Sequence, residues 1–492
     1  MKIRLSISAT PSVELRYGVG WNWADFLGSG GFYARSSIYP LSTPCVPELH
    51  DEAGWRALMA TLDDLRPGFI RFSLPPDPHV GGAPGRIVTD TVHLARLERL
   101  NEWAVRNGCT IMLDTFFIPA CYEFPVPPGV SDGRNCVNMA AADNDAYAGE
   151  FIAPLLRHVL VERDLQAVRL FNPVNEPLIY GCYQTPGNQP DVFLHYVDMY
   201  RALDASLRRA GLRERVQVVG IDGVEAAQFC LEKLDALGAS LDPYVDAYSI
   251  HFYFELFDWM TPPRRPFPWK HLRDGVDRDS ARLARLCRER GKPLSVAEAG
   301  TFAFGMGHRG DPAGPTRHEA ALLAAETVLR AWNAGVAGGA FWSLFNSNDA
   351  DGWWATVQIR DGRALPATHP YHTYRLLSRH ARPGSTAHPL VSNEEGAVHH
   401  VHGTWLVGPE SSPVVILIND HFTETQTVEL ALPPDCGAAQ WSWLSKDAVR
   451  IDEPPRTLAE AGSGRLSAEL APMSLNVWRP AGARLSQPTE TR

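Results

Sequence analysis

The chain has 492 residues, 45% of them hydrophobic, and a formal net charge of -10. This length exceeds an ordinary single domain, so we expect one large domain and a smaller one. The acidic balance argues against nucleic acid or an anionic membrane surface as the main partner, because both select basic patches. No apolar run approaches the length of a membrane span. The sequence does not indicate an oligomeric state.

The chain begins MKIRLSISATPSVELRYG, in which polar and apolar residues alternate. A signal peptide needs a continuous apolar stretch, so this alternation predicts a strand instead. We therefore expect a cytoplasmic protein, or a secreted one if a leader precedes this start in nature.

Between about residue 16 and residue 380, short apolar runs alternate with amphipathic segments of helical period. Clear helical stripes occur at 51–66, 190–210, 279–290 and 369–381. The GSGG run at 28–31 lacks the spacing of a dinucleotide-binding loop. Eight strands alternating with helices predict a (β/α)8 barrel. The strands are expected at 16–21, 68–74, 110–117, 167–176, 216–222, 245–253, 293–300 and 338–345.

The pattern changes after RPGST at 382–386. Short alternating runs separated by Pro, Gly, Asp and Asn predict an antiparallel β-sandwich, and the N-terminal strand could join it. The fold class is therefore α/β, a TIM barrel with an accessory sandwich. The expected boundaries are 1–15 for the N-terminal strand, 16–382 for the barrel, 383–480 for the sandwich and 481–492 for a disordered tail.

Polar and aromatic residues stand at the ends of six of the predicted strands. In a (β/α)8 barrel the active site lies where the carboxyl ends of the strands open into loops. Two of the residues, Glu176 and Glu298, are carboxylates at separate strand ends, without a histidine cluster spaced for a metal. The candidate site residues are Arg71, Asp114, Asn175, Glu176, His251, Tyr253, Glu298 and Trp342.

A pair of carboxylates at a barrel mouth suits glycoside hydrolysis. One carboxyl group protonates the leaving oxygen, and the other attacks the anomeric carbon to form a covalent glycosyl-enzyme. The acid needs a raised pKa, whereas the nucleophile must stay ionised. We expect Arg71 and Tyr253 to hold the nucleophile in its charged form, and Asn175 to donate to a sugar hydroxyl.

These residues resemble the retaining glycoside hydrolases of clan A. The resemblance rests on Asn175-Glu176-Pro177 after the fourth strand, His251-x-Tyr253 after the sixth, Glu298 after the seventh and Trp342 after the eighth. The Arg-Phe pair at 71–72 on the second strand matches too. Families 5, 30 and 39 of the clan share parts of the pattern, and APMSLNVWRP at 471–480 is similar to the closing strand of their sandwiches.

The resemblance implies that Glu176 is the acid/base and Glu298 the nucleophile, with net retention and no cofactor or metal. Two departures keep the family open. Family 5 usually has a histidine at the end of the third strand, where this chain has Asp114 and Phe116. Family 39 usually continues its motif with a second asparagine, where this chain has Leu178.

Several of the candidates have a second interpretation. Arg71 could be a structural ion-pair partner, His251 a core histidine and Trp342 either core or a platform for a sugar ring. For Asp114, contact with substrate and a structural role at the strand end are equally supported.

The function predicted is a retaining β-glycosidase. Proline-rich segments such as YEFPVPPG and TPPRRPFPW follow the third and sixth strands and favour a closed pocket, hence exo-action or short oligosaccharides. The alternatives are an endo-acting polysaccharide hydrolase, a transglycosidase and a catalytically silent carbohydrate-binding barrel.

Overall fold

The structure is a computed structural model. It describes residues 2–24, 52–81, 84–115, 118–119, 121–122, 141–176, 192–223, 227–254, 269–301, 317–345, 355–360, 363–366, 368–392, 400–409, 413–436, 440–460 and 464–481. The segments that follow several barrel strands lie outside these ranges, as do the last residues, 482–492.

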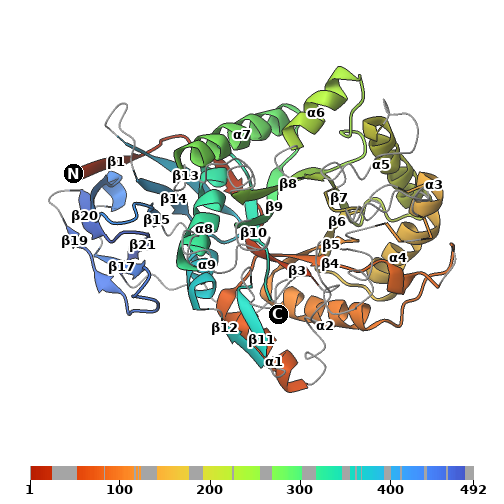
Figure 1. The fold of residues 1–492 in the computed structure, drawn as a ribbon, viewed down its shortest axis with the longest axis horizontal. Helices are drawn as coiled ribbons and strands as arrows, with labels where there is room; N and C mark the ends of the chain where they lie inside the picture. The colour runs from red at the N-terminus through yellow and green to blue at the C-terminus, as the bar shows by residue number, and fades with distance from the viewer. Residues whose placement is uncertain are drawn as a thin grey trace, which may run out of the picture.

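The centre of the molecule is a closed barrel of parallel strands in the order β10-β3-β4-β5-β6-β7-β8-β9 (Figure 1). β10 closes the ring by pairing with both β3 and β9. The strands are nearly continuous in apolar residues because helices cover their outer face. Their bounds are β3 Gly18–Ala24, β4 Phe69–Ser73, β5 Thr110–Asp114, β6 Val168–Asn172, β7 Gln217–Gly223, β8 Ala247–Phe254, β9 Leu294–Thr301 and β10 Gly338–Phe341.

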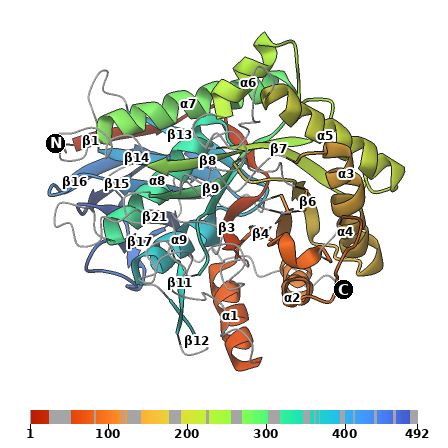
Figure 2. The same ribbon diagram turned by 45° about the vertical axis from the view of Figure 1, so that its right-hand side comes forward.

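Helices follow the strands and surround the barrel (Figures 1 and 2). Among them α2 is capped at both ends: the Thr91 hydroxyl accepts from Leu94 N–H, and Gly108 ends the helix in the left-handed conformation. The main helices are α1 Glu52–Leu65, α2 Val92–Asn107, α5 Val192–Arg209, α6 Ala227–Ala236, α7 Trp269–Glu289, α8 Arg317–Ala334 and α9 Thr368–His380; between β5 and β6 lie the shorter α3 Asn144–Ala146 and α4 Ala153–Arg157, with π-helical turns at Tyr147–Ile152 and His158–Glu162.

The predicted barrel is confirmed, with all eight strands in the expected places, but the fourth strand ends earlier than predicted. β6 stops at Asn172, so Asn175 and Glu176 lie beyond the strand instead of within it. The reason is Pro173, which has no N–H to continue the ladder. A two-stranded hairpin, β11 Val357–Arg360 and β12 Arg363–Pro366, was also not predicted.

The C-terminal part forms the predicted accessory domain, a mostly antiparallel set of strands. Two layers enclose a core that includes Trp405, Trp441 and Trp478. One layer has the order β18-β17-β21-β15-β14-β13, and β1-β16-β20-β19 continues from it. The bounds are β13 Ser385–Ser392, β14 Val401–Val407, β15 Pro413–Asn419, β16 Gln426–Ala431, β17 Trp441–Lys446, β18 Arg456–Thr457, β19 Ala459–Glu460, β20 Arg465–Leu470 and β21 Ser474–Pro480.

The N-terminal strand β1, Lys2–Ile7, lies in this accessory domain (Figure 1). It pairs antiparallel with β13 and parallel with β16. The short β2, Val13–Leu15, also pairs with β13 and leads into the barrel. The two ends of the chain therefore build the sandwich together.

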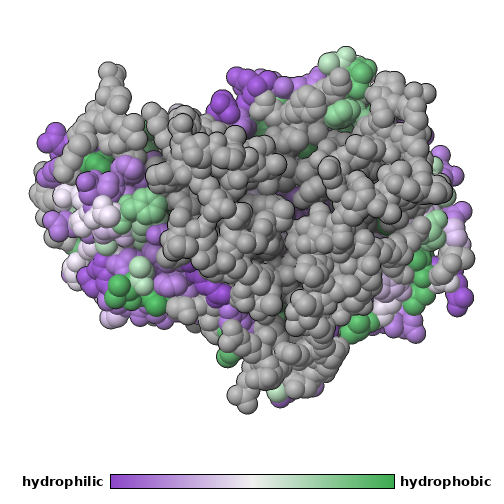
Figure 3. Space-filling model, viewed as in Figure 1, coloured by the Kyte–Doolittle hydropathy of each residue, from purple (hydrophilic) through white to green (hydrophobic). Residues whose placement is uncertain are grey.

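Helix α8 joins the barrel to the sandwich. Its Asn333 donates to the Gly403 carbonyl of β14 at 2.9 Å and accepts from the Thr404 hydroxyl at 2.7 Å. The face of the sandwich that Figure 3 shows is mostly hydrophilic in its described part, with small apolar patches. No described helix is long and apolar enough to cross a membrane.

The interior of the barrel is packed at its amino-terminal end. Each strand contributes one buried side chain to a layer there; for β3 the residue comes from just before the strand. Around the ring these side chains become smaller, from aromatic residues to alanine. In (β/α)8 barrels the active site lies at the opposite, carboxyl-terminal end of the strands. The layer consists of Tyr17, Phe69, Met112, Leu170, Val219, Ala247, Ala297 and Ala340.

Candidate active site

The carboxyl ends of the strands bring the candidate residues into one buried polar cluster. Arg71 comes from β4, Asp114 from β5, His251 and Tyr253 from β8, and Glu298 from β9. Six further residues belong to the cluster or its edge: Asn22 on β3, Asn172 at the end of β6, Asn175 and Glu176 beyond it, Asp222 on β7 and Trp342 after β10.

Arg71 is the centre of this cluster and is completely buried. Its Nη1 lies 2.6 Å from Glu298 Oε1, and its Nη2 lies 2.6 Å from Asp222 Oδ2 and 2.9 Å from Asp114 Oδ2. Burial opposes a charge on the guanidinium, but the carboxylates outweigh it and hold the pKa of Arg71 above its ordinary value. The expectation that Arg71 pairs with Glu298 matches this geometry.

Glu298 accepts hydrogen bonds on both oxygens. Arg71 donates to Oε1, and the Tyr253 hydroxyl donates to Oε2 at 2.5 Å. Burial raises the pKa of Glu298, and the nearby Glu176 raises it further, while His251, Arg71 and Tyr253 oppose the rise. These donors favour the ionised carboxylate, but burial outweighs them, and the pKa of Glu298 stays above its ordinary value.

Glu176 lies in a left-handed backbone conformation, with φ at 44°. Its N–H donates to the Asp222 carbonyl at 3.0 Å, and its Oε1 lies 2.6 Å from His251 Nδ1. A non-glycine residue with positive φ is strained and is often found at a functional site. The carboxyl group is thus held in place from both its backbone and its side chain.

His251 contacts carboxylates through both ring nitrogens. Besides Glu176, Nδ1 lies 3.5 Å from Glu298 Oε2, and Nε2 lies 3.2 Å from Asp222 Oδ1. Burial alone would lower its pKa, but Glu298 and Asp222, with the hydrogen bond to Glu176, raise the pKa of His251 to about 10. The interpretation of His251 as an ordinary core histidine does not fit this environment.

The remaining candidates lie around these groups. Asp114 is buried against Arg71 and accepts from the Ser73 hydroxyl at 3.1 Å, which favours its strand-end interpretation. Asn175 Oδ1 accepts from Arg71 at 2.7 Å, which leaves its NH2 group as the side that can donate to a sugar hydroxyl. Trp342 is buried directly after β10.

The sequence interpretation missed three cluster residues, Asn22, Asn172 and Asp222. Asn22 Oδ1 accepts from Arg71 at 3.0 Å, and Asn172 donates to Asp222 Oδ2 at 2.5 Å. All three lie at or near strand ends, so the rule that selected the other residues could have selected them. Asn22 follows the predicted first strand and Asp222 ends the predicted fifth, whereas Asn172 lies inside the predicted fourth strand, 167–176.

Two sets of described residues have the composition of a cation site. Glu176, His251 and Glu298 have ligand atoms within 4.8 Å of one another, but Arg71 and Tyr253 already donate to Glu298. The second set is Glu326 on α8 with His402 and Asp420 of the sandwich. There the guanidinium of Arg330 donates to Glu326 at 2.7 Å and already supplies a positive charge beside this carboxylate.

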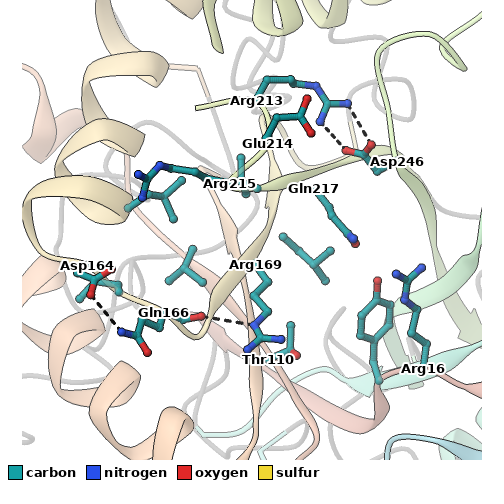
Figure 4. A pocket seen from close by; sticks show the side chains of 16 residues that line it. Arg16, Thr110, Asp164, Gln166, Arg169, Arg213, Glu214, Arg215, Gln217 and Asp246 are labelled. Carbon is teal, nitrogen blue, oxygen red and sulfur yellow. Dashed lines mark hydrogen bonds and ion pairs between the residues drawn. The ribbon is translucent and has the colours of Figure 1, made fainter. Parts of the chain in front are cut away.

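A cavity of about 680 Å³ opens at the opposite, amino-terminal end of the barrel, between the starts of β5, β6 and β7 (Figure 4). Arg16, Arg169 and Arg215 line it, and Arg213 forms an ion pair with Asp246 there at 2.9 Å. None of the residues that line it belongs to the cluster around Arg71. In (β/α)8 barrels this face serves stability, whereas chemistry occurs at the other.

No protein-family model and no curated protein matches the sequence. Many solved structures match the fold. The catalytic domain of the GH30 xylanase C from Talaromyces cellulolyticus is 12% identical with a TM-score of 0.64, over 97% of this chain and 100% of that one. A GH30 endoxylanase from Clostridium papyrosolvens C71 is also 12% identical, with a TM-score of 0.64 over 98% and 100%.

A third similar structure is AbfB, a family 51 alpha-L-arabinofuranosidase from Bifidobacterium longum. It is 13% identical, with a TM-score of 0.60 over 97% of this chain and 99% of that one. The similarity covers barrel and sandwich together. It confirms the predicted architecture, which this chain shares with glycoside hydrolases of families 30 and 51.

Proposed function

We propose that this protein is a retaining glycoside hydrolase with Glu298 as nucleophile and Glu176 as acid/base. The observation that carries the proposal is their separation: a carboxylate oxygen of each lies within 4.8 Å of the other. Retaining enzymes have carboxyl groups about 5–5.5 Å apart, whereas inverting enzymes leave room for a water at roughly 6.5–9.5 Å.

In the first half-reaction Glu298 attacks the anomeric carbon, and the bond to the leaving oxygen breaks as that oxygen takes the proton of Glu176. In the second, water attacks the same carbon, gives its proton to Glu176 and releases Glu298. Asn175 donates to a sugar hydroxyl beside the reacting carbon. Trp342 supplies an apolar surface of the kind that packs against a sugar ring.

For the substrate, we propose short oligosaccharides or single glycosides in β linkage, cleaved from an end. The support is the length of chain that follows strands β5, β6 and β8, because long segments at a barrel mouth can wall a pocket. Those segments lie outside the described residues. A screen of aryl β-glycosides of glucose, galactose, xylose, mannose, fucose and arabinose, with an aryl α-L-arabinofuranoside added, identifies the sugar.

The decisive variant is Glu298→Ala. With the best aryl glycoside from the screen, we expect turnover to fall on the order of 10⁴-fold or more, as for loss of a catalytic nucleophile. Added azide should restore turnover and give the glycosyl azide of opposite anomeric configuration, because it attacks from the vacated side.

The matched control is Glu326→Gln, a buried glutamate on α8, outside the cluster. It should leave turnover unchanged. Proton NMR of the first sugar released by the unaltered protein should show the anomer of the substrate. Unchanged turnover in Glu298→Ala, or release of the inverted anomer, would falsify the assignment.

A further inference from the structure

Asp222 contacts the backbone of the proposed acid/base, Glu176, and also His251 and Arg71. Its Oδ1 is 3.2 Å from His251 Nε2, and its Oδ2 is 2.6 Å from Arg71. Its carbonyl oxygen accepts the N–H of Glu176 at 3.0 Å. One residue therefore holds the backbone of Glu176 directly and its side chain through His251.

The backbone around Asp222 is built to aim this side chain. Ile221 and Asp222 have positive φ of 69° and 42°, and the register against β8 shifts between Ile221 and Gly223. A β-bulge redirects a side chain and is common beside active sites, while positive φ in a β-branched residue is strained. The fold maintains this strained bulge at the point where Asp222 enters the cluster.

The role of Asp222 depends on which ring nitrogens of His251 carry hydrogen. A neutral imidazole carries hydrogen on one nitrogen only. Nδ1 lies 2.6 Å from Glu176 Oε1, and Nε2 lies 3.2 Å from Asp222 Oδ1. When the proton of Glu176 is on Oε2, ready for the leaving oxygen, Oε1 can only accept, and the bare nitrogen of a neutral ring would face an oxygen lone pair. The doubly protonated ring satisfies both contacts at once.

We propose that Asp222 is a positioning residue for the acid/base: its carboxylate keeps hydrogen on both ring nitrogens of His251 and aims Nδ1–H at Glu176. This proposal rests on the function proposed above. When Glu176 gives its proton to the leaving oxygen, the Nδ1–H donates to the carboxylate that forms. The charge is thereby stabilised where it develops.

The charges around the ring support this protonation. Three carboxyl groups face His251, namely Glu298 from β9, Asp222 from β7 and Glu176 from beyond β6, and they raise its pKa to about 10. Arg71 and His251 in turn hold the pKa of Asp222 below its ordinary value, although burial acts in the other direction. Asp222 is therefore a permanent negative charge beside the ring.

The test compares leaving groups of one sugar, the best from the screen. Phenyl glycosides need proton donation to leave, whereas 2,4-dinitrophenyl glycosides do not. Asp222→Asn should lower kcat/KM for the phenyl glycoside about 10–100-fold, the usual cost of losing a supporting partner. It should change kcat/KM for the dinitrophenyl glycoside far less. Added to His251→Asn, it should have little further effect.

Asp114→Asn is the matched control, because it removes one charge from the same Arg71 nitrogen. It should affect both glycosides equally. An equal loss on both substrates in Asp222→Asn, or no loss, would overturn the proposal. If Asp222→Asn does not fold, Ser249→Ala replaces it, since the Ser249 hydroxyl donates to Asp222 Oδ1 at 2.6 Å. That variant should show a smaller loss with the same selectivity.

A second measurement does not depend on turnover. In the full chain labelled with ¹⁵N-histidine, His251 should keep both ring hydrogens at about pH 8, where an ordinary histidine is neutral. The His251→Asn variant assigns the signal. Asp222→Asn, or Ser249→Ala in its place, should lower the pH at which the second hydrogen is lost. If the protein cleaves no aryl glycoside, the proposed function fails, and this titration still decides the protonation of His251; a neutral ring in the unaltered protein would refute the role of Asp222.

Discussion

Two buried histidines of this protein have pKa values that are shifted in opposite directions. His251 at the barrel mouth faces three carboxyl groups, and its pKa is raised to about 10. His318, on α8 at the boundary with the sandwich, has its Nδ1 2.7 Å from the Lys446 amine, and burial and this amine lower its pKa to about 3. Burial alone would lower both values, so the neighbouring charge determines the sign.

The surroundings of the two histidines differ in whether a proton can move. His318 Nε2 donates to the Met473 carbonyl at 2.6 Å, so its Nδ1 can only accept, and Lys446 supplies the hydrogen. That arrangement is a fixed connection between α8 and strand β17. His251 instead contacts Glu176, whose proton moves in the proposed reaction. The same residue type thus docks two domains in one region and serves acid/base chemistry in the other.

Of the variants that compare the barrel mouth with the domain boundary, Arg71→Met should lower the free energy of unfolding most. Without the guanidinium, Asp114, Asp222 and Glu298 are buried without their shared cation, and removal of one partner from a buried ion pair costs about 3–5 kcal/mol. Denaturant unfolding should show a loss of this size. Arg330→Met at the boundary should cost less, because one of its two partners, Asp277, is half-exposed. Equal losses would contradict the view that the mouth cluster depends on Arg71.

Glu176→Gln should affect chemistry more than folding. Loss of a general acid lowers the rate about 10²–10⁴-fold, so kcat/KM for a phenyl glycoside should fall by that factor. A dinitrophenyl glycoside should be much less affected at the same step. The pKa of His251 should also fall, because its hydrogen bond to the Glu176 carboxylate helps to raise it. A phenyl glycoside cleaved at the original rate would exclude Glu176 as the acid.

Lys446→Met should stabilise the protein at acidic pH. Burial lowers the pKa of Lys446 to about 7, so the folded state takes up this proton less readily than the unfolded state. The resulting cost is complete below pH 7 and disappears as the pH rises towards the ordinary lysine value of about 10.4. The midpoint of thermal unfolding at pH 5 should therefore rise by the equivalent of about 1 kcal/mol or more. A gain of the same size at pH 10.5 would show that packing, not charge, is responsible.

A last effect is the pH dependence that His251 itself contributes to stability. Because its folded pKa is raised to about 10, its contribution to stability is complete below the unfolded value of about 6.5 and is lost as the pH rises through about 10. The difference in unfolding midpoint between the unaltered protein and His251→Asn should shrink over this window. A difference that grows with pH would reverse the sign assigned to the cluster.

Strand ends were a good guide to the site because chain direction alone places them at one face of a barrel. This rule selected Glu176, Glu298 and the pair His251 and Tyr253, although they come from three separate segments of the sequence. Asp222 ends the predicted fifth strand and fits the same rule, but its contacts with Arg71 and His251 depend on a bulge, and a bulge leaves no clear mark in the alternation of residues. The predicted fourth strand extends to residue 176, whereas β6 already ends at Asn172, because Pro173 has no N–H to continue the ladder.

The sequence by itself determined the eight-stranded barrel, the second domain and the carboxylate pair, because hydrophobic periodicity and strand direction are local properties of the chain. Only the tertiary structure decided which side chains share protons and charges. Arg71 is 43 residues from Asp114 and 227 from Glu298 along the chain, and no local pattern encodes such contacts. The distances between buried groups set their pKa values, and those distances exist only once the barrel has closed.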